Sequence, residues 1–289
     1  MNATTNPGAG ATSTTATDDG LGEITRKTFY ESAESYVLGG GFIVLMLLLW
    51  EAVPHVVTFS KGMSLFFTTP SKVFYKLYEL LATGILVPGL KFSSSAFCAG
   101  LAMSIVVALP LGVMLGRWQT LNAMFDPFIT AINATPRLVF LPIVMIWLGI
   151  GFWTVTVIVF IGAVFPLLIN TYAGVRNADR LLINVVRSFG ASEWQINKMV
   201  VLPNSVPFII AGLRLAIGRA VLGIVVAEFF GGSSEGVGVV MVDAAGKFHV
   251  DVVFAGLIVF MTLSLIMTGI VKAIENKFSR WRPQLVKTF

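Results

Sequence analysis

Long apolar stretches separated by short polar ones predict a helical membrane protein. A helix needs about 20 apolar residues to cross the hydrocarbon core of a bilayer. The chain offers six such stretches, at about residues 37–53, 92–116, 129–148, 152–172, 206–230 and 252–271. Residues 138–175 carry no charge and are too many for one crossing, so we expect a break at Gly149-Ile150-Gly151. The predicted fold is all-α and polytopic.

The polar parts of the chain suggest three regions. Residues 1–35 form a polar extension, and its first 22 residues lack an apolar stripe, so we expect disorder there. Residues 36–275 form the transmembrane domain, and residues 276–289 a basic tail. Within residues 54–91, Val73, Leu77, Leu80 and Leu81 recur at helical spacing and predict a short helix along the membrane interface.

Glycines and prolines add local expectations. Gly112 and Gly116 form a GxxxG pair that permits close helix contact. Pro142 and Pro166 should kink the helices that contain them. The glycine-rich stretch 231–238 reads as a flexible outer turn.

Residues 179–203 form a polar segment between two long apolar runs and predict two short helices. Asp179 is a candidate N-cap, and an apolar stripe follows it up to Phe189. Gly190 can take the left-handed conformation that ends a helix. Ser192 and Gln195 have the spacing of a capping box, so a second helix starts there. Pro203 is expected to end it near residue 201 or 202.

Composition supports the membrane assignment. The chain is 56% hydrophobic and 12% charged, whereas soluble domains carry about 25% charged residues. The net charge of +5 is therefore interpreted by position and not as a sign of nucleic-acid binding. With six spans both termini share one side, and that side holds twelve Lys and Arg against five on the other. The positive-inside bias makes this side, with segment 179–203, cytoplasmic.

The sequence shows no motif for catalysis, metal binding or nucleotide binding. Cys98 is the only cysteine, and His55 and His249 lack the spacing of metal ligands. Gly246-Lys247 is followed by Phe248, so no P-loop is present. No catalytic constellation can be assembled, and we expect neither an enzyme nor a cofactor or metal bound by this chain.

Segment 179–203 resembles the EAA motif of the membrane subunits of type I ABC importers. The resemblance lies in Arg187-Ser188-Phe189-Gly190-Ala191-Ser192-x-Trp194-Gln195 and Leu202-Pro203. It departs where Asn184-Val185-Val186 replaces Glu-Ala-Ala. Further matches, such as Gly212-Leu-Arg214 and Phe165-Pro166, are similar to the nitrate/sulfonate/taurine-type branch and extend from about residue 92 to residue 282.

This resemblance implies a permease of the bacterial inner membrane that imports a small solute, organic or inorganic anions being typical of the branch. It implies a second permease copy, two ATPase subunits that hold ATP and Mg²⁺, and an external solute-binding protein. The ATPase would dock on a cytoplasmic coupling loop formed by Arg187, Ser188, Phe189, Gly190, Ala191, Ser192, Glu193, Trp194, Leu202 and Pro203.

Charged and polar residues inside spans are candidates for the transport pathway. Arg137 lies in the third span, Asn170 in the fourth and Glu228 near the outer end of the fifth. The alternative for the charged pair is a buried structural ion pair or snorkelling to the headgroups, while Asn170 would only join helices. Arg214 and Arg219 are interpreted as packing residues or headgroup anchors.

Two other functions remain open from the residues alone. An ion-driven secondary transporter would need titratable groups at mid-membrane and often two similar halves; the chain shows no evident repeat. The other possibility is a membrane scaffold or an intramembrane enzyme. An intramembrane enzyme would need a catalytic group, and none is found in the sequence.

Overall fold

The computed structural model describes residues 19–56 and 66–279, in two units that divide after Thr58. The first unit contains α1 (Asp19–Val56), whose residues 37–56 are apolar enough to cross a membrane. The first span is therefore confirmed. Helix already begins at Asp19, so the last four of the 22 residues expected to be disordered are helical, while residues 1–18 lie outside the described part.

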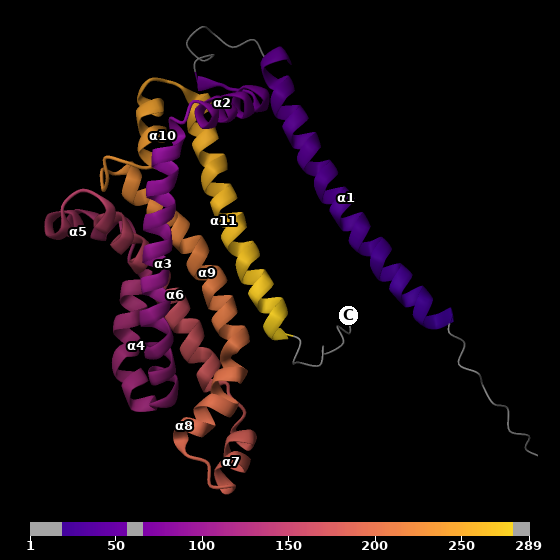
Figure 1. Ribbon diagram of the computed structural model, residues 1–289, viewed down its shortest axis with the longest axis vertical. Helices are drawn as coiled ribbons and strands as arrows, with labels where there is room; N and C mark the ends of the chain where they lie inside the picture. Colours follow the sequence, from indigo (N-terminus) through magenta and orange to yellow (C-terminus); the bar gives the residue numbers. More distant parts are fainter. Residues whose placement is uncertain (1–18, 57–65, 280–289) are drawn as a thin grey trace, which may run out of the picture. The chain divides into compact units, whose positions relative to one another are not determined.

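The second unit consists of helices only, within the residues that are described. Its elements are α2 (Pro70–Ala82), α3 (Leu86–Arg117), α4 (Gln119–Ala134), the 3-10 helix η2 (Arg137–Phe140), α5 (Leu141–Leu148), α6 (Phe152–Arg176), α7 (Arg180–Ser188), α8 (Glu193–Ile196), the π turn η3 (Asn197–Val201), α9 (Leu202–Phe229), α10 (Val237–Gly246) and α11 (Val250–Ser279) (Figure 1).

Three long helices, α3, α6 and α9, form the core of this unit (Figure 1). Small residues let their backbones approach: a side chain at Gly112 would come within 2.6 Å of Thr171 Cβ, and one at Gly116 within 2.5 Å of Val175 Cβ. The predicted contact through the GxxxG pair is thus confirmed. Gly112 and Gly116 continue a row of small residues at every fourth position of α3, which begins at Ala96.

The third predicted span is not a single straight helix. α4 and the η2–α5 pair meet at an angle of 95° around Thr135-Pro136. Proline disfavours helical geometry in the residue before it, and Thr135 is extended there. Pro142 lies in the first turn of α5 and so starts a helix instead of kinking one. The expected break at 149–151 is confirmed, since Gly149 and Gly151 both have positive φ.

Pro203 does not end the second helix of segment 179–203, contrary to the prediction. α8 passes through η3 into α9, and the helix runs from Glu193 to Phe229. In a regular helix a proline clashes with the carbonyl four residues back. The wider π turn directly before Leu202-Pro203 accommodates the ring, and Pro203 falls in the first turn of α9.

The two ends of the second unit differ in character. α7 and α8 lie at one end, while α2 and α10 lie at the other (Figure 1). α2 confirms the short helix expected after residue 54; its buried Val73 and Leu80 face the protein, and α11 is its main neighbour, whereas Leu81 is exposed. α10 was not foreseen, and it lies where part of the flexible turn 231–238 was predicted.

Candidate functional site

Segment 179–203 has the capped helices that its residues predict. Asp179 accepts a hydrogen bond from the Leu181 backbone N–H at 2.8 Å, and α7 ends after Ser188. Gly190 follows with φ of +83°, and its N–H donates to the Arg187 carbonyl at 2.9 Å. The Ser192–Gln195 capping box then starts α8. These three local predictions are confirmed.

A small apolar cluster fixes the segment to the bundle. Ile196 and Val201 are fully buried and pack with Val175 and Ala178 at the end of α6. Because α8 continues into α9, a displacement of α8 is passed directly to a helix of the core. The segment is thus a stiff projection of the bundle and not a loose loop.

Ion pairs hold α7 against α8. Glu193 accepts from Arg187 at 2.8 Å and also pairs with Arg117 at the end of α3. The hydrogen bond from Arg187 and the two guanidinium charges hold the pKa of the Glu193 carboxyl below its usual value. The helix 193–229 is about 55 Å long at 1.5 Å per residue, longer than the ~30 Å hydrocarbon core, so this end projects out of the bilayer.

The outward face of the segment is apolar. The side chains of Phe189 and Trp194 are 87% and 71% exposed, and Leu181 and Val185 of α7 are exposed beside them. Large apolar side chains on a polar segment that projects from the bundle make it a candidate protein-binding surface. Asn184, which replaces the glutamate of the motif, is also exposed, and its carbonyl accepts from the Ser188 hydroxyl at 3.1 Å.

The remaining predicted docking residues take several positions. Ser188, Ser192 and Glu193 are exposed and Ala191 is half-buried. Leu202 is half-buried and Pro203 exposed in the first turn of α9. The predicted residues therefore gather at one end of the bundle.

At the opposite end, Glu228 is buried, with 2% of its surface exposed. Its carboxylate accepts from the Ser93 hydroxyl and from the Gly238 backbone N–H, both at 2.6 Å. Ser93 also accepts from the Val237 N–H at 3.0 Å. At Gly236 a Cβ would collide with this carboxylate. Glu228 thus ties α3 and α9 to the first turn of α10. The turn at Gly236 is packed tightly against it and is not the flexible turn predicted from its glycines.

Ser93 escaped the sequence analysis because 135 residues separate it from Glu228. Glu228 also has no cationic partner among the described side chains, so the buried ion pair considered for it does not form there. Backbone N–H and hydroxyl donors stabilise the carboxylate instead.

Arg137 lies in η2, at the bend of the third span, and is half-buried. Asn170 donates to the Pro166 carbonyl at 2.8 Å and packs where α9 passes closest, at Gly212. Arg214 pairs with Glu275 of α11 at 2.5 Å, which agrees with the packing role expected for it.

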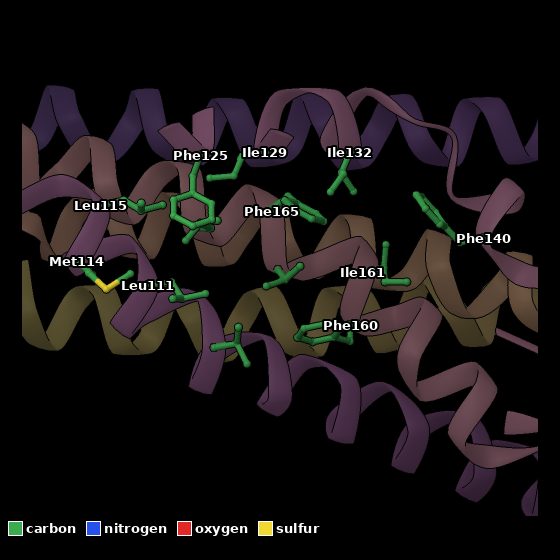
Figure 2. A pocket seen from close by; sticks show the side chains of 13 residues that line it. Leu111, Met114, Leu115, Phe125, Ile129, Ile132, Phe140, Phe160, Ile161 and Phe165 are labelled. Atoms are coloured by element: carbon green, nitrogen blue, oxygen red, sulfur yellow. The ribbon is translucent and has the colours of Figure 1, made fainter. Parts of the chain in front are cut away.

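Two cavities accompany these residues. One, of about 190 Å³, is polar and lies beside α7, with Arg117, Arg176 and Arg180 in its wall. The other, of about 330 Å³, is lined by apolar side chains of α3, α4, η2 and α6 (Figure 2). Its labelled lining residues are Leu111, Met114, Leu115, Phe125, Ile129, Ile132, Phe140, Phe160, Ile161 and Phe165. No polar side chain lines the larger cavity, which therefore suits apolar groups and not an ion.

The features above define a membrane permease subunit: a helical bundle with a projecting, apolar-faced helix pair at one end. Among residues 37–56 and 66–276, no group of three His, Cys, Asp or Glu could hold a metal ion. Residues 100–280 match the family of binding-protein-dependent transport system inner membrane components, and the chain belongs to that family.

Similar proteins with a description support this family assignment. The chain is 34% identical over 206 residues to a putative ABC transporter permease protein of Methanocaldococcus jannaschii, covering 71% of this chain and 77% of the relative. It is 32% identical to the putative aliphatic sulfonates transport permease protein SsuC of Bacillus subtilis, covering 74% and 77%. It is 27% identical to the taurine transport system permease protein TauC of Escherichia coli, covering 85% and 90%.

Solved structures share the fold. An inward-facing structure of the MetNI methionine ABC transporter aligns with a TM-score of 0.58 at 17% identity, covering 66% of this chain and 94% of that chain. The protein is thus a multi-pass inner-membrane permease subunit of an ABC importer, which forms the pore while a separate ATPase hydrolyses ATP. The family resemblance drawn from segment 179–203 is confirmed, and the secondary-transporter alternative is set aside.

Proposed function

We propose that this permease imports a small sulfonate-like anion and that segment 179–203 is its coupling element. ATP binding would close the ATPase pair, and the segment would convert this closure into rotation of the core helices. Hydrolysis would return the pathway to its inward-open state. The observation that carries the proposal is the exposed apolar face of Phe189 and Trp194 on helices fixed to α6 and continuous with α9.

The contacts of the segment suit a rigid lever to which the ATPase stays bound in both its open and its closed state. α8 has no flexible joint to α9, so force on Trp194 reaches the middle of the bundle. Arg187 and Arg117 both hold Glu193, and this bridges the two helices of the segment to α3. Docking in this protein would rest on apolar contacts, since Asn184 lacks the charge of the glutamate that it replaces.

Orientation and assembly follow from charge and symmetry. The bias of twelve Lys and Arg against five supports cytoplasmic termini and a cytoplasmic segment 179–203. Two copies of the chain related by a two-fold axis would present two such segments to two ATPase subunits, with the pathway along the axis. A solute-binding protein would meet the opposite end, where α2 and α10 lie.

Residues of the pathway are part of the same proposal. Arg137, at a break in a membrane helix, would line it. Asn170 would lie beside it, at the close contact of α6 and α9. Glu228 would act at its outer gate, because it joins both core helices to the turn that the binding protein would meet.

Co-purification tests the coupling proposal. The tagged full chain is co-expressed with its candidate partner ATPase and extracted in mild detergent, and the bound ATPase is quantified. Phe189→Ala and Trp194→Ala should each weaken the complex by about 30-fold, as expected for an aromatic anchor worth about 2 kcal/mol. Phe230→Ala removes another exposed phenylalanine, at the other end of α9, and serves as the control. Equal ATPase recovery from all three variants would refute docking on this face.

A further inference from the structure

Two arginines meet at the middle of the membrane bundle. Near Gly162 of α6, a Cβ would come within 2.9 Å of the Arg219 carbonyl oxygen and within 3.5 Å of the Cδ and Nε atoms of Arg137. The side chain of Arg137 therefore lies where α6 and α9 touch, and its charge is close enough to be repelled by that of Arg219. Residues 82 positions apart are brought together by the bend in the third span.

The depth of this pair follows from helix geometry. Gly162 is ten residues from the start of α6 at Phe152, or about 15 Å at 1.5 Å per residue. The hydrocarbon core is about 30 Å thick, so the side chain of Arg137 and the backbone of Arg219, which both lie beside Gly162, are near its midplane. From the sequence, Arg219 was interpreted as a packing residue or a headgroup anchor, and its backbone packs against α6 at Gly162.

Neither arginine is neutralised by the protein. In the part of the chain whose side chains are described, neither guanidinium has an ion pair or a side-chain hydrogen bond. Arg214, five residues earlier on α9, does have a carboxylate partner in Glu275. An arginine at the midplane of a bilayer has a high free-energy cost, so such residues face a water-filled cavity or a polar partner and not lipid.

The surface of α9 around the pair is also open. Arg219 and its neighbour Gly218 are exposed, and a side chain added at Gly218 would meet nothing within 4 Å. Of the two arginines only Arg219 is exposed, whereas Arg137 is half-buried. An exposed arginine at this depth is unfavourable against acyl chains, which favours a position that faces the pathway.

We propose that Arg137 and Arg219 together form the binding site for the anionic group of the transported solute. Two planar guanidinium groups offer paired N–H donors that match the oxygens of a sulfonate or carboxylate. A compact organic anion would supply the negatively charged partner that the two arginines lack among the described side chains. This inference rests on the proposed function, because it places the site in the pathway of the importer.

Cysteine labelling tests the site without relying on transport. Cys98 is exposed and is first replaced by alanine. Gly218→Cys is then introduced into the full chain in liposomes. Its rates of reaction with a sulfonate-bearing and a trimethylammonium-bearing methanethiosulfonate are measured relative to free cysteine. The anionic reagent should react at least about fivefold faster, the factor that one charge about 4 Å away gives in water.

Matched variants assign the preference to the pair. Arg137→Gln and Arg219→Gln should each lower the preference, Arg137→Lys should retain it, and Arg214→Gln on the same helix should leave it unchanged. Excess ethanesulfonate should slow the anionic reagent only while both arginines are present. Failure of the thiol introduced by Gly218→Cys to react with either reagent, or a preference that survives both Gln variants, would overturn the proposal. ATPase co-purification is unaffected by these outcomes, so a failure here is distinct from a failure of the coupling proposal.

Discussion

Replacement of Gly190 probes the link between segment 179–203 and transport most directly. Gly190 has φ of +83°, and a Cβ there would meet no atom within 4 Å. Alanine would therefore fit in space, and its penalty is conformational, about 1–2 kcal/mol for the left-handed region. Asparagine tolerates this region better than alanine. Proline cannot reach positive φ and also removes the N–H that donates to Arg187.

ATP-driven uptake should therefore be highest in the wild type and fall in the order Gly190→Asn, Gly190→Ala and Gly190→Pro. A penalty of 1–2 kcal/mol corresponds to an about 5- to 30-fold smaller population of the docking geometry, and proline should abolish it. The assay is ATP-driven solute uptake, with ATPase activity, by the reconstituted importer. Because a side chain added at Gly190 would meet no atom within 4 Å, the thermal unfolding temperature of the bundle should stay within a few degrees.

Gly84 provides the matched control. It also has positive φ with no atom within 4 Å of an added Cβ, but it lies in the turn between α2 and α3 at the other end of the unit. Gly84→Pro should leave the recovery of bound ATPase unchanged. Wild-type coupling in Gly190→Pro, or an equal loss of ATPase from Gly190→Pro and Gly84→Pro, would refute the reasoning.

Three further variants test the fold around the proposed sites. Glu228→Leu leaves the buried Gly238 N–H without an acceptor, which should destabilise the bundle by about 1–3 kcal/mol in detergent unfolding, whereas Glu235→Gln at an exposed position should not. Gly112→Val places a side chain onto Thr171 of α6 and should separate α3 from α6, measured as a lower unfolding temperature; an unchanged value would contradict the close packing. Ile196→Ala opens a cavity at the base of α8 and should loosen the segment, seen as faster proteolysis within residues 179–203 while the core helices stay protected.

The sequence alone determined the features that depend on neighbouring residues. Span positions follow from runs of apolar residues because a helix that crosses lipid must satisfy its own backbone and be apolar over about 20 residues. Asp179, Gly190 and the Ser192–Gln195 pair could be assigned because caps act within a few residues. The family could likewise be identified from segment 179–203, and residues 100–280 match it.

Tertiary structure decided where distant residues meet. Pro203 reads as a helix stop, yet a π turn carries the helix through it because Ile196 and Val201 are held in one buried cluster. Ser93 carries no sequence signal as the partner of Glu228, since the pairing needs α3 and α9 packed side by side. Arg137 and Arg219 are brought together only by the 95° bend and by the absence of a side chain at Gly162. Local patterns record the preferences of the backbone, whereas these contacts exist only after the helices pack.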